Sequence, residues 1–208
     1  MAAVILLCGG QQQRLFDLGY PKQLIRVAGE PILARTARLV RSLMSDVEIY
    51  VAAAADGTLS GTCREHDLVE CVVPHEPMLL NVQRVMESQG LEQATVFLGD
   101  VCWSRSLLAK WLDECSNRST LFCARLGPSA VTGKAYSEHF AIHCTLSDLH
   151  RLDARRFFRL EDAARTNVFG AERLVAQPEG DFTEDFDTQE DVQRLVPLLS
   201  ALVLEEAA

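Results

Sequence analysis

Short apolar runs recur along the first half of the chain, separated by longer stretches in which apolar residues follow a helical period. Near-continuous apolar runs of this length are typical of strands that are buried on both faces of a sheet. They predict strands over residues 3–7, 47–53, 68–73 and 95–98.

The stretches between these runs have the apolar spacing of amphipathic helices. They predict helices over residues 31–43, 81–89 and 104–115. Pro31 stands at the first helical position, which proline favours, and Asn81 and Ser104 stand where N-cap residues begin a helix. Strands that alternate with helices of this length are joined by right-handed crossovers and pair in parallel. The pattern therefore predicts an α/β fold with a mostly parallel central sheet.

The alternation weakens after a further predicted strand over residues 121–124. Residues 125–138 are rich in Gly, Pro, Ser and Thr, which is typical of a loop excursion. A predicted strand over 140–144 follows, and then predicted helices over 146–152, 156–165 and 189–204. We expect one Rossmann-like three-layer domain over residues 1–208, with a small C-terminal excursion. Its two halves are residues 1–124 and 125–208.

The composition is that of an ordinary globular protein, since 48% of the 208 residues are hydrophobic and 24% are charged. No apolar run approaches the roughly 20 residues that a transmembrane helix needs. The apolar stretch over residues 2–8 has neither a basic flank nor a cleavage site, so it does not resemble a signal peptide. We therefore expect a cytoplasmic protein that does not bind a membrane.

The cysteines and the net charge exclude some classes of protein and of binding partner. The seven cysteines are scattered and form no C-x-x-C pair, which argues against a zinc ribbon or a disulfide framework. The formal net charge of −9 argues against nucleic acid as a partner, because phosphate neutralisation needs a basic face. A small phosphate substrate is compatible with this charge if the few cations gather in one cleft.

A glycine-rich loop follows the first predicted strand. It runs through Leu7, Cys8, Gly9, Gly10, Gln11, Gln12 and Arg14 and is followed by Lys22. Ligands bind beyond the carboxyl ends of strands in open α/β sheets, and successive N–H groups at a Gly-Gly pair form an anion-binding nest. Neither the G-x-G-x-x-G dinucleotide pattern nor a Walker loop is present. A simple Gly-Gly turn with Arg14 and Lys22 at the surface is the alternative.

Three segments together resemble the signature of the nucleotidyltransferase superfamily. They are Val4-Ile5-Leu6-Leu7-Cys8-Gly9-Gly10 through Arg14, then Pro21-Lys22-Gln23-Leu24, and then Val27-Ala28-Gly29-Glu30-Pro31-Ile32-Leu33. This superfamily includes sugar-phosphate nucleotidyltransferases, small cytidylyltransferases and molybdopterin-cofactor nucleotidyltransferases. The chain departs from the usual signature at Cys8, where a small residue is common, and at Gln12, where glycine is common.

Two acidic positions extend the resemblance. Asp100 follows Gly99 at the end of a predicted strand and resembles the family's metal-binding G-D pair. Asp187 lies in Glu184-Asp185-Phe186-Asp187-Thr188-Gln189, which resembles a D-x-D-T-P segment with Gln189 in place of proline. The resemblance implies that Asp100 and Asp187 hold Mg²⁺, while Thr188 and Asp191 cap the last helix. It remains open whether Asp100 is instead a helix N-cap, and whether Asp185 assists or faces solvent.

The resemblance implies a transfer of a nucleoside monophosphate from an NTP to a small phosphorylated acceptor, such as a sugar phosphate, with release of pyrophosphate. Residues 1–124 would then bind the nucleotide and residues 125–208 the acceptor. Arg14 and Lys22 would be catalytic, Leu7, Cys8, Gly9, Gly10, Gln11, Gln12 and Asn81 would bind the nucleotide, and Lys134 would contact the acceptor. The compact length favours CTP by analogy with small cytidylyltransferases. The oligomeric state is left open.

Several residues have a second interpretation at this point. Asn81 is also a candidate helix cap, and the segment 132–134 is also a candidate surface turn. Asp185 and Asp187 form a D-x-D pair that a nucleotide-sugar glycosyltransferase would use, and Gln12 is compatible with a catalytically idle domain. His139 and His143, four residues apart in a predicted strand, would face the same side of the sheet.

Overall fold

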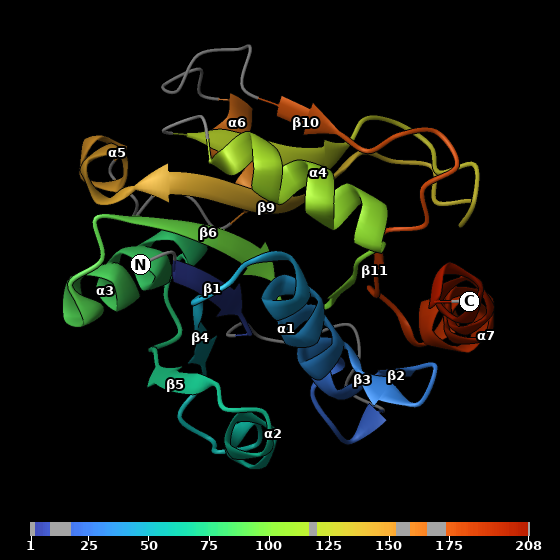
Figure 1. The fold of residues 1–208 in the computed structure, drawn as a ribbon, viewed down its shortest axis with the longest axis horizontal. Coiled ribbons are helices and arrows are strands. Elements are labelled where there is room, and N and C mark those ends of the chain that lie inside the picture. Colours follow the sequence, from blue (N-terminus) through green and yellow to red (C-terminus); the bar gives the residue numbers. More distant parts are fainter. Residues whose placement is uncertain (1–2, 9–17, 117–119, 153–158, 166–173, 208) are drawn as a thin grey trace.

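A seven-stranded sheet forms the centre of the molecule (Figure 1). The computed structural model describes residues 3–8, 18–116, 120–152, 159–165 and 174–207. The strands of the sheet are, in spatial order, β10 (Leu174–Ala176), β8 (Leu121–Arg125), β9 (Glu138–Thr145), β6 (Gln93–Leu98), β1 (Ala3–Leu7), β4 (Glu48–Ala53) and β5 (Val69–Val72). Every pairing described in this sheet is parallel except the two that β9 makes with β6 and β8. The predicted α/β class is confirmed.

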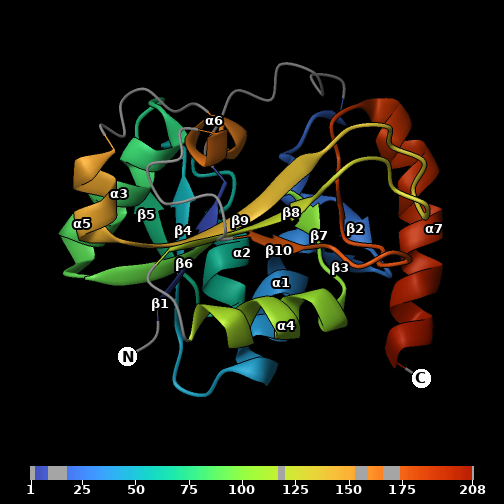
Figure 2. The same ribbon diagram turned by 90° about the horizontal axis from the view of Figure 1, so that it is seen from above.

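Helices cover both faces of the sheet (Figure 2). One face packs against α1 (Ile32–Leu43), α2 (Ser60–Glu65) and α4 (Arg105–Cys115), and the other against α3 (Met78–Gln89), α5 (Leu146–Arg151) and α6 (Leu160–Arg165). The first core lies between the sheet and α1, α2 and α4, and the second core lies between the sheet and α3, α5 and α6. Successive side chains of β1 alternate between them, so that Leu6 belongs to the first core and Ile5 to the second. Both faces are thus buried, which explains the continuous apolar run that predicted this strand.

A third apolar cluster lies to one side of the sheet. It joins α7 (Gln189–Ala207) to the hairpin of β2 (Arg26–Val27) and β3 (Glu30–Pro31), with Ile25, Phe186 and Leu195 among its buried members. This cluster fixes the turn η2 (Lys22–Leu24), which directly precedes the hairpin, relative to the C-terminal helix. Both segments contribute to the site described below.

The elements missed by the sequence patterns are short. They are η2, α2, β10, the β2–β3 hairpin, and the ribbon of β7 (Val101–Cys102) with β11 (Glu184–Asp185). The strands among them have two or three residues, which is too few for a measurable periodicity, so their pairing partners decide them. The helix α2 has only six residues. Several predicted boundaries also shift: α1 begins at Ile32, α3 begins at Met78 rather than at residue 81, and β6 begins at Gln93 rather than at residue 95.

The prediction that His139 and His143 face the same side of the sheet is wrong. Ala141 pairs with Cys123 and His139 pairs with Ala124, so β9 carries an extra residue, Phe140, at this point. Consecutive Phe140 and Ala141 therefore both belong to the first core. The bulge turns His139 towards Phe122 and Glu161, whereas Nδ1 of His143 lies 2.9 Å from Oγ1 of Thr95. The two imidazoles therefore lie on opposite faces of the sheet.

All seven cysteines are free, as the sequence predicted. Burial raises the pKa of the thiols, to about 11 for Cys63 and about 12 for Cys102 and Cys144. None of the helices within the described ranges combines the length and the apolar composition that a membrane crossing needs.

Candidate active site

The ends of β1 and β6 meet at one edge of the sheet. Leu7 pairs with Leu98, and the amide of Gly99 donates to the carbonyl of Leu7 at 2.8 Å. A Cβ atom on Gly99 would lie 2.9 Å from the carbonyl oxygen of Leu7 and 2.5 Å from Sγ of Cys8. Only glycine therefore allows the chain to pass so close to the end of β1, and Asp100 is placed directly beside the start of the glycine-rich loop.

Lys22 reaches this edge from η2. The side-chain amide of Gln23 donates to the carbonyl of Cys8 at 3.5 Å, which connects η2 to the end of β1. The Nζ atom of Lys22 lies 3.5 Å from Oδ2 of Asp100 and 3.9 Å from Oδ1 of Asp187. The structure thus brings together three residues that sequence patterns had selected separately.

The ribbon of β7 and β11 brings Asp187 to Asp100. Asp185 in β11 pairs antiparallel with Val101 in β7, so the residues just beyond the two strands lie side by side. The predicted cap of α7 is also present, because Oγ1 of Thr188 accepts from the amide of Asp191 at 3.1 Å. In return, Oδ2 of Asp191 accepts from the amides of Thr188 and Asp187. This reciprocal cap fixes the backbone at Asp187.

Lys134 enters the site from the loop between β8 and β9. Its side chain is buried, and its Nζ donates to Oδ1 of Asp185 at 2.7 Å and to Oδ2 of Asp187 at 3.4 Å. The nearby carboxylates outweigh the effect of burial and raise the pKa of Lys134 above its ordinary value, so it remains an ammonium ion. The interpretation of residues 132–134 as an exposed surface turn is wrong at Lys134.

Two further residues of this segment lie in the site and were not selected from the sequence. The hydroxyl of Tyr136 donates to Oδ2 of Asp187 at 2.7 Å, and a carboxylate oxygen of Glu138 lies within 4.8 Å of those of Asp185 and Asp187. Lys134, Tyr136 and Glu138 are spaced two residues apart along the chain, and Glu138 is the first residue of β9. Extending the period of two backwards from the predicted strand would have put all three on one side.

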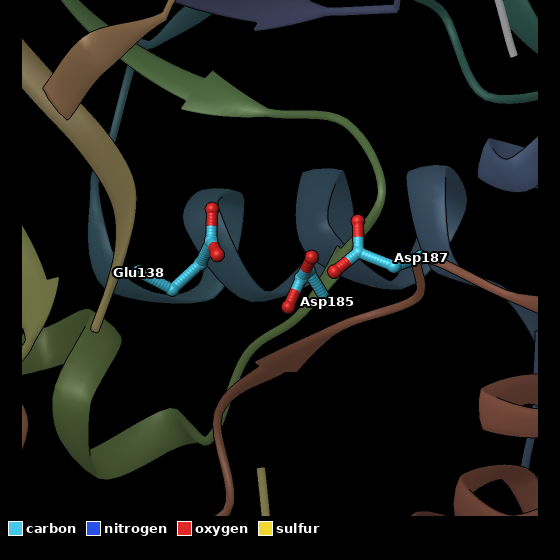
Figure 3. Close-up of side chains that lie close together, drawn as sticks. All are labelled: Glu138, Asp185 and Asp187. Carbon is cyan, nitrogen blue, oxygen red and sulfur yellow. The ribbon is translucent and has the colours of Figure 1, made fainter. Parts of the chain in front are cut away.

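Figure 3 shows the three carboxyl groups, with Glu138 on β9 and the two aspartates on β11 and the segment that follows it. Burial, together with neighbouring carboxylates, raises the pKa of Glu138 to about 9. Burial raises the pKa of Asp185 to about 8, although Lys134 opposes the shift. Asp187 differs: burial disfavours its ionised form, but Tyr136, Lys134 and Lys22 more than compensate and lower its pKa. Asp187 is therefore the ionised member of the cluster.

The donor set at this edge fits Mg²⁺. Asp100 and Asp187 are both partly exposed, and both direct an oxygen at the same ammonium group. A magnesium ion prefers one or two carboxylates together with substrate phosphates and water, and the two convergent carboxylates supply the protein part of that set. The residues present are thus compatible with the cation that the sequence resemblance implies.

The structure describes only some of the residues that were predicted to bind the triphosphate. Gly9, Gly10, Gln11, Gln12 and Arg14 lie outside the described residues. Leu7 ends β1, and the amide of Cys8 donates to the carbonyl of Ala52 at 2.9 Å.

Asn81 does not begin a helix, because α3 starts at Met78 and Pro77 holds the N-cap position. The side chain of Asn81 is buried and donates to the carbonyls of Pro74 and Glu76, at 3.2 and 3.4 Å. It thereby closes the turn before α3.

Asp100 and Asp185 do not have the local roles of helix cap and solvent-facing residue. Asp100 is not the N-cap of the next helix, because Ser104 takes that position and its hydroxyl accepts from the amide of Leu107 at 3.1 Å. Asp185 does not face solvent, since only 5% of its surface is exposed. Both carboxylates are thus available to the site rather than to local capping or hydration.

Comparison with known proteins agrees with this geometry. Residues 4–165 match the family described as the MobA-like NTP transferase domain. No curated protein sequence matches the chain at a significant level.

Solved structures with the same fold cover nearly the whole chain. A UDP-glucose pyrophosphorylase in complex with UDP-glucose has a TM-score of 0.69 at 10% identity, over 99% of both chains. CTP:phosphocholine cytidylyltransferase from Streptococcus pneumoniae has a TM-score of 0.66 at 12% identity, over 96% of this chain and 100% of its own. A putative glucose-1-phosphate thymidylyltransferase from Bacillus anthracis has a TM-score of 0.66 at 14% identity, over 97% of this chain and 95% of its own.

The family match covers most of the chain and includes η2, Asp100 and nearly all of β1, whereas Asp187, which also carried the resemblance, lies beyond it. It decides against the glycosyltransferase and the idle domain that the sequence had left open. The chain belongs to the family of MobA-like NTP transferase domains and is a nucleotidyltransferase.

Proposed function

We propose that the protein transfers a nucleoside monophosphate from an NTP to a small phosphorylated acceptor in a Mg²⁺-dependent reaction, with CTP as the nucleotide. The observation that carries this proposal is the position of Lys22, whose ammonium lies 3.5 Å from Asp100 and 3.9 Å from Asp187 at the carboxyl edge of the parallel sheet. An NTP bound at this edge would bring its α-phosphate to Lys22, with the two carboxylates opposite.

The transfer needs no catalytic base among the side chains. An acceptor phosphate is already anionic near neutral pH, so one of its oxygens attacks the α-phosphorus while the bond from the α-phosphorus to the pyrophosphate oxygen breaks. Positioning and charge stabilisation then supply most of the catalysis. Lys22 neutralises charge at the α-phosphate, and Arg14 holds the departing pyrophosphate. When bound at Asp100 and Asp187, Mg²⁺ supplies Lewis-acid stabilisation of the phosphate oxygens.

The two halves of the chain divide the substrates between them in this proposal. Residues 9–12 bind the triphosphate through backbone N–H groups, and Leu7, Cys8 and Asn81 contact the nucleotide. Lys134 contacts the acceptor phosphate. Its ammonium already has Asp185 and Asp187 as partners, so an acceptor phosphate would have to replace one of them.

The choice of base rests on analogy. The folds that resemble this chain include a cytidylyltransferase, a UDP-glucose pyrophosphorylase and HddC from Yersinia pseudotuberculosis in complex with GMP-PN. The scaffold therefore accommodates several bases, and we favour CTP because compact superfamily members are often cytidylyltransferases. The net charge of −9 supports small substrates rather than nucleic acid, and we propose a cytoplasmic location.

A ligand screen tests the nucleotide. Thermal unfolding is measured with CTP, GTP, ATP, UTP and dTTP, each with and without Mg²⁺. A nucleotide at 100 times its dissociation constant stabilises a protein by about 2.7 kcal/mol, which is readily detected. We expect CTP to give the largest shift, and only with Mg²⁺. A larger shift with another NTP would correct the base, and no shift with any of them would contradict nucleotide binding.

Release of pyrophosphate tests the reaction. The nucleotide that binds is incubated with sugar phosphates and with phosphocholine, and pyrophosphate is measured during a titration of Mg²⁺. Asp187→Asn should lose most of the Mg²⁺-dependent rate, because a neutral amide replaces one of the two carboxylate ligands. The control is Asp46→Asn, an exposed residue with φ of 55° that asparagine also adopts, and its rate should not change. Equal rates for both variants would contradict the metal assignment.

A further inference from the structure

The two oxygens of Asp187 have different partners. Oδ2 accepts from the hydroxyl of Tyr136 at 2.7 Å and from Nζ of Lys134 at 3.4 Å. Oδ1 faces Nζ of Lys22 at 3.9 Å, on the side where Asp100 lies. One oxygen is therefore held by the β8–β9 loop, and the other is directed at the proposed metal site.

The backbone of Tyr136 is held by hydrogen bonds from Arg125. The guanidinium of Arg125 donates to the carbonyl of Tyr136 through Nε at 3.2 Å and through a terminal nitrogen at 3.1 Å. Arg125 is buried and forms an ion pair with the fully buried Glu184, so it is an immobile anchor. The ring of Tyr136 also lies against Lys134, whose Nζ is 5.8 Å from the ring centroid. The phenol thus reaches Asp187 from a fixed backbone.

We propose that Tyr136 is a positioning residue for metal binding, whose hydroxyl holds Oδ2 of Asp187 so that Oδ1 is presented to the cation. A carboxylate free to rotate would present either oxygen, and its lone pairs would be aimed at the cation only part of the time. The hydrogen bond from Tyr136 to Oδ2 removes this rotational freedom before the metal binds. This inference rests on the proposed function of Asp187 as a metal ligand.

Tyr136 is suited to a test because its side chain is 47% exposed. Removing its hydroxyl leaves no buried cavity, so a purely structural role would produce little effect of any kind. A change in metal binding without a change in stability is therefore specific to positioning. Loss of such an outer contact to a metal ligand typically weakens metal binding or activity by about 10- to 100-fold.

The test compares Tyr136→Phe with Tyr50→Phe. The hydroxyl of Tyr50 donates to Oε2 of Glu48 at the same distance, 2.7 Å, but Glu48 begins β4 and so lies at the opposite edge of the sheet. Binding of Mn²⁺, used as a spectroscopic probe with the same preference for oxygen ligands, is measured by electron paramagnetic resonance. The Mg²⁺ concentration for half-maximal pyrophosphate release and the urea midpoint are measured alongside.

We expect Tyr136→Phe to raise the Kd for Mn²⁺ and the half-maximal Mg²⁺ concentration about 10-fold, with the KM for the NTP and the urea midpoint little changed. Tyr50→Phe should leave both metal measurements unchanged. An unchanged Kd for Mn²⁺ in Tyr136→Phe would overturn the inference, whatever its stability. Failure of the wild-type protein to bind Mn²⁺ or to respond to Mg²⁺ would instead overturn the proposed function, so the two failures are distinguishable.

Discussion

The ammonium group of Lys22 lies 3.5 Å from Oδ2 of Asp100. The two residues are far apart along the chain, because the elements from β2 to β6 lie between them. The contact forms because η2 is connected to the end of β1 through Gln23 and Cys8, while Gly99 brings the end of β6 to the same place. Two strand ends and one short turn thus assemble the charged centre of the site.

Lys22→Ala should lower turnover by about 100-fold or more, because a cation that acts on charge developing in the transition state contributes on this scale. The KM for the NTP should change much less, since the contact is strongest in the transition state. Steady-state release of pyrophosphate measures both quantities. Lys110→Ala, at an exposed position of α4, is the control. Unchanged turnover in Lys22→Ala would remove Lys22 from the mechanism.

Gly99→Ala should destabilise the protein by about 1–3 kcal/mol, the usual cost of inserting a methyl group into closely packed surroundings. The new Cβ would meet the backbone carbonyl of Leu7, which cannot move without disturbing β1. Gly61→Ala is the opposite case, because nothing lies within 4 Å of the added Cβ and the residue is in α2. It should stabilise the protein by about 0.4–1 kcal/mol. Urea unfolding measures both, and equal effects would show that the contact at Gly99 does not constrain the fold.

Lys134→Met should destabilise the protein by about 1–3 kcal/mol, because the buried carboxyl group of Asp185 loses its hydrogen-bond donor, while Glu184 keeps its ion pair with Arg125. The same substitution at the exposed Lys110 should change the free energy of unfolding by less than about 0.5 kcal/mol. Chemical denaturation compares the two variants. An effect as small as that at position 110 would mean that the hydrogen bond from Lys134 to Asp185 does not contribute to stability.

The thiols should react slowly in the native protein. Burial raises the pKa of Cys63 to about 11, so only a small fraction is thiolate at pH 8, and the thiolate is the reactive form. Cys71 is the one cysteine that is not fully buried, so it should be alkylated first. Mass spectrometry after treatment with iodoacetamide, with and without urea, follows the order. Fast modification of Cys102 or Cys144 in the native protein would contradict the packing of the core.

The sequence by itself determined the α/β class, because strands buried on both faces must be apolar along their whole length, and that pattern needs no partner to be recognised. It also determined the cap of α7, since Thr188 and Asp191 interact across a single turn. Lys22, Asp100 and Asp187 were selected from local motifs and the resemblance that they carry. The end of β6, at Asp100, meets the end of β1 at one edge of the sheet, as the fold class implies, whereas η2 and the β7–β11 ribbon bring Lys22 and Asp187 to it.

Only the tertiary structure decided which groups surround Lys22, Asp100 and Asp187. The bulge at Phe140 reversed the expected orientation of His139, and Lys134 proved to be buried among carboxylates instead of lying in a surface turn. Tyr136 and Glu138 entered the site because the β7–β11 ribbon brings Asp185 and Asp187 beside them. A bulge, a two-residue ribbon and a buried ion pair depend on contacts between distant segments. No local period in the sequence records such contacts.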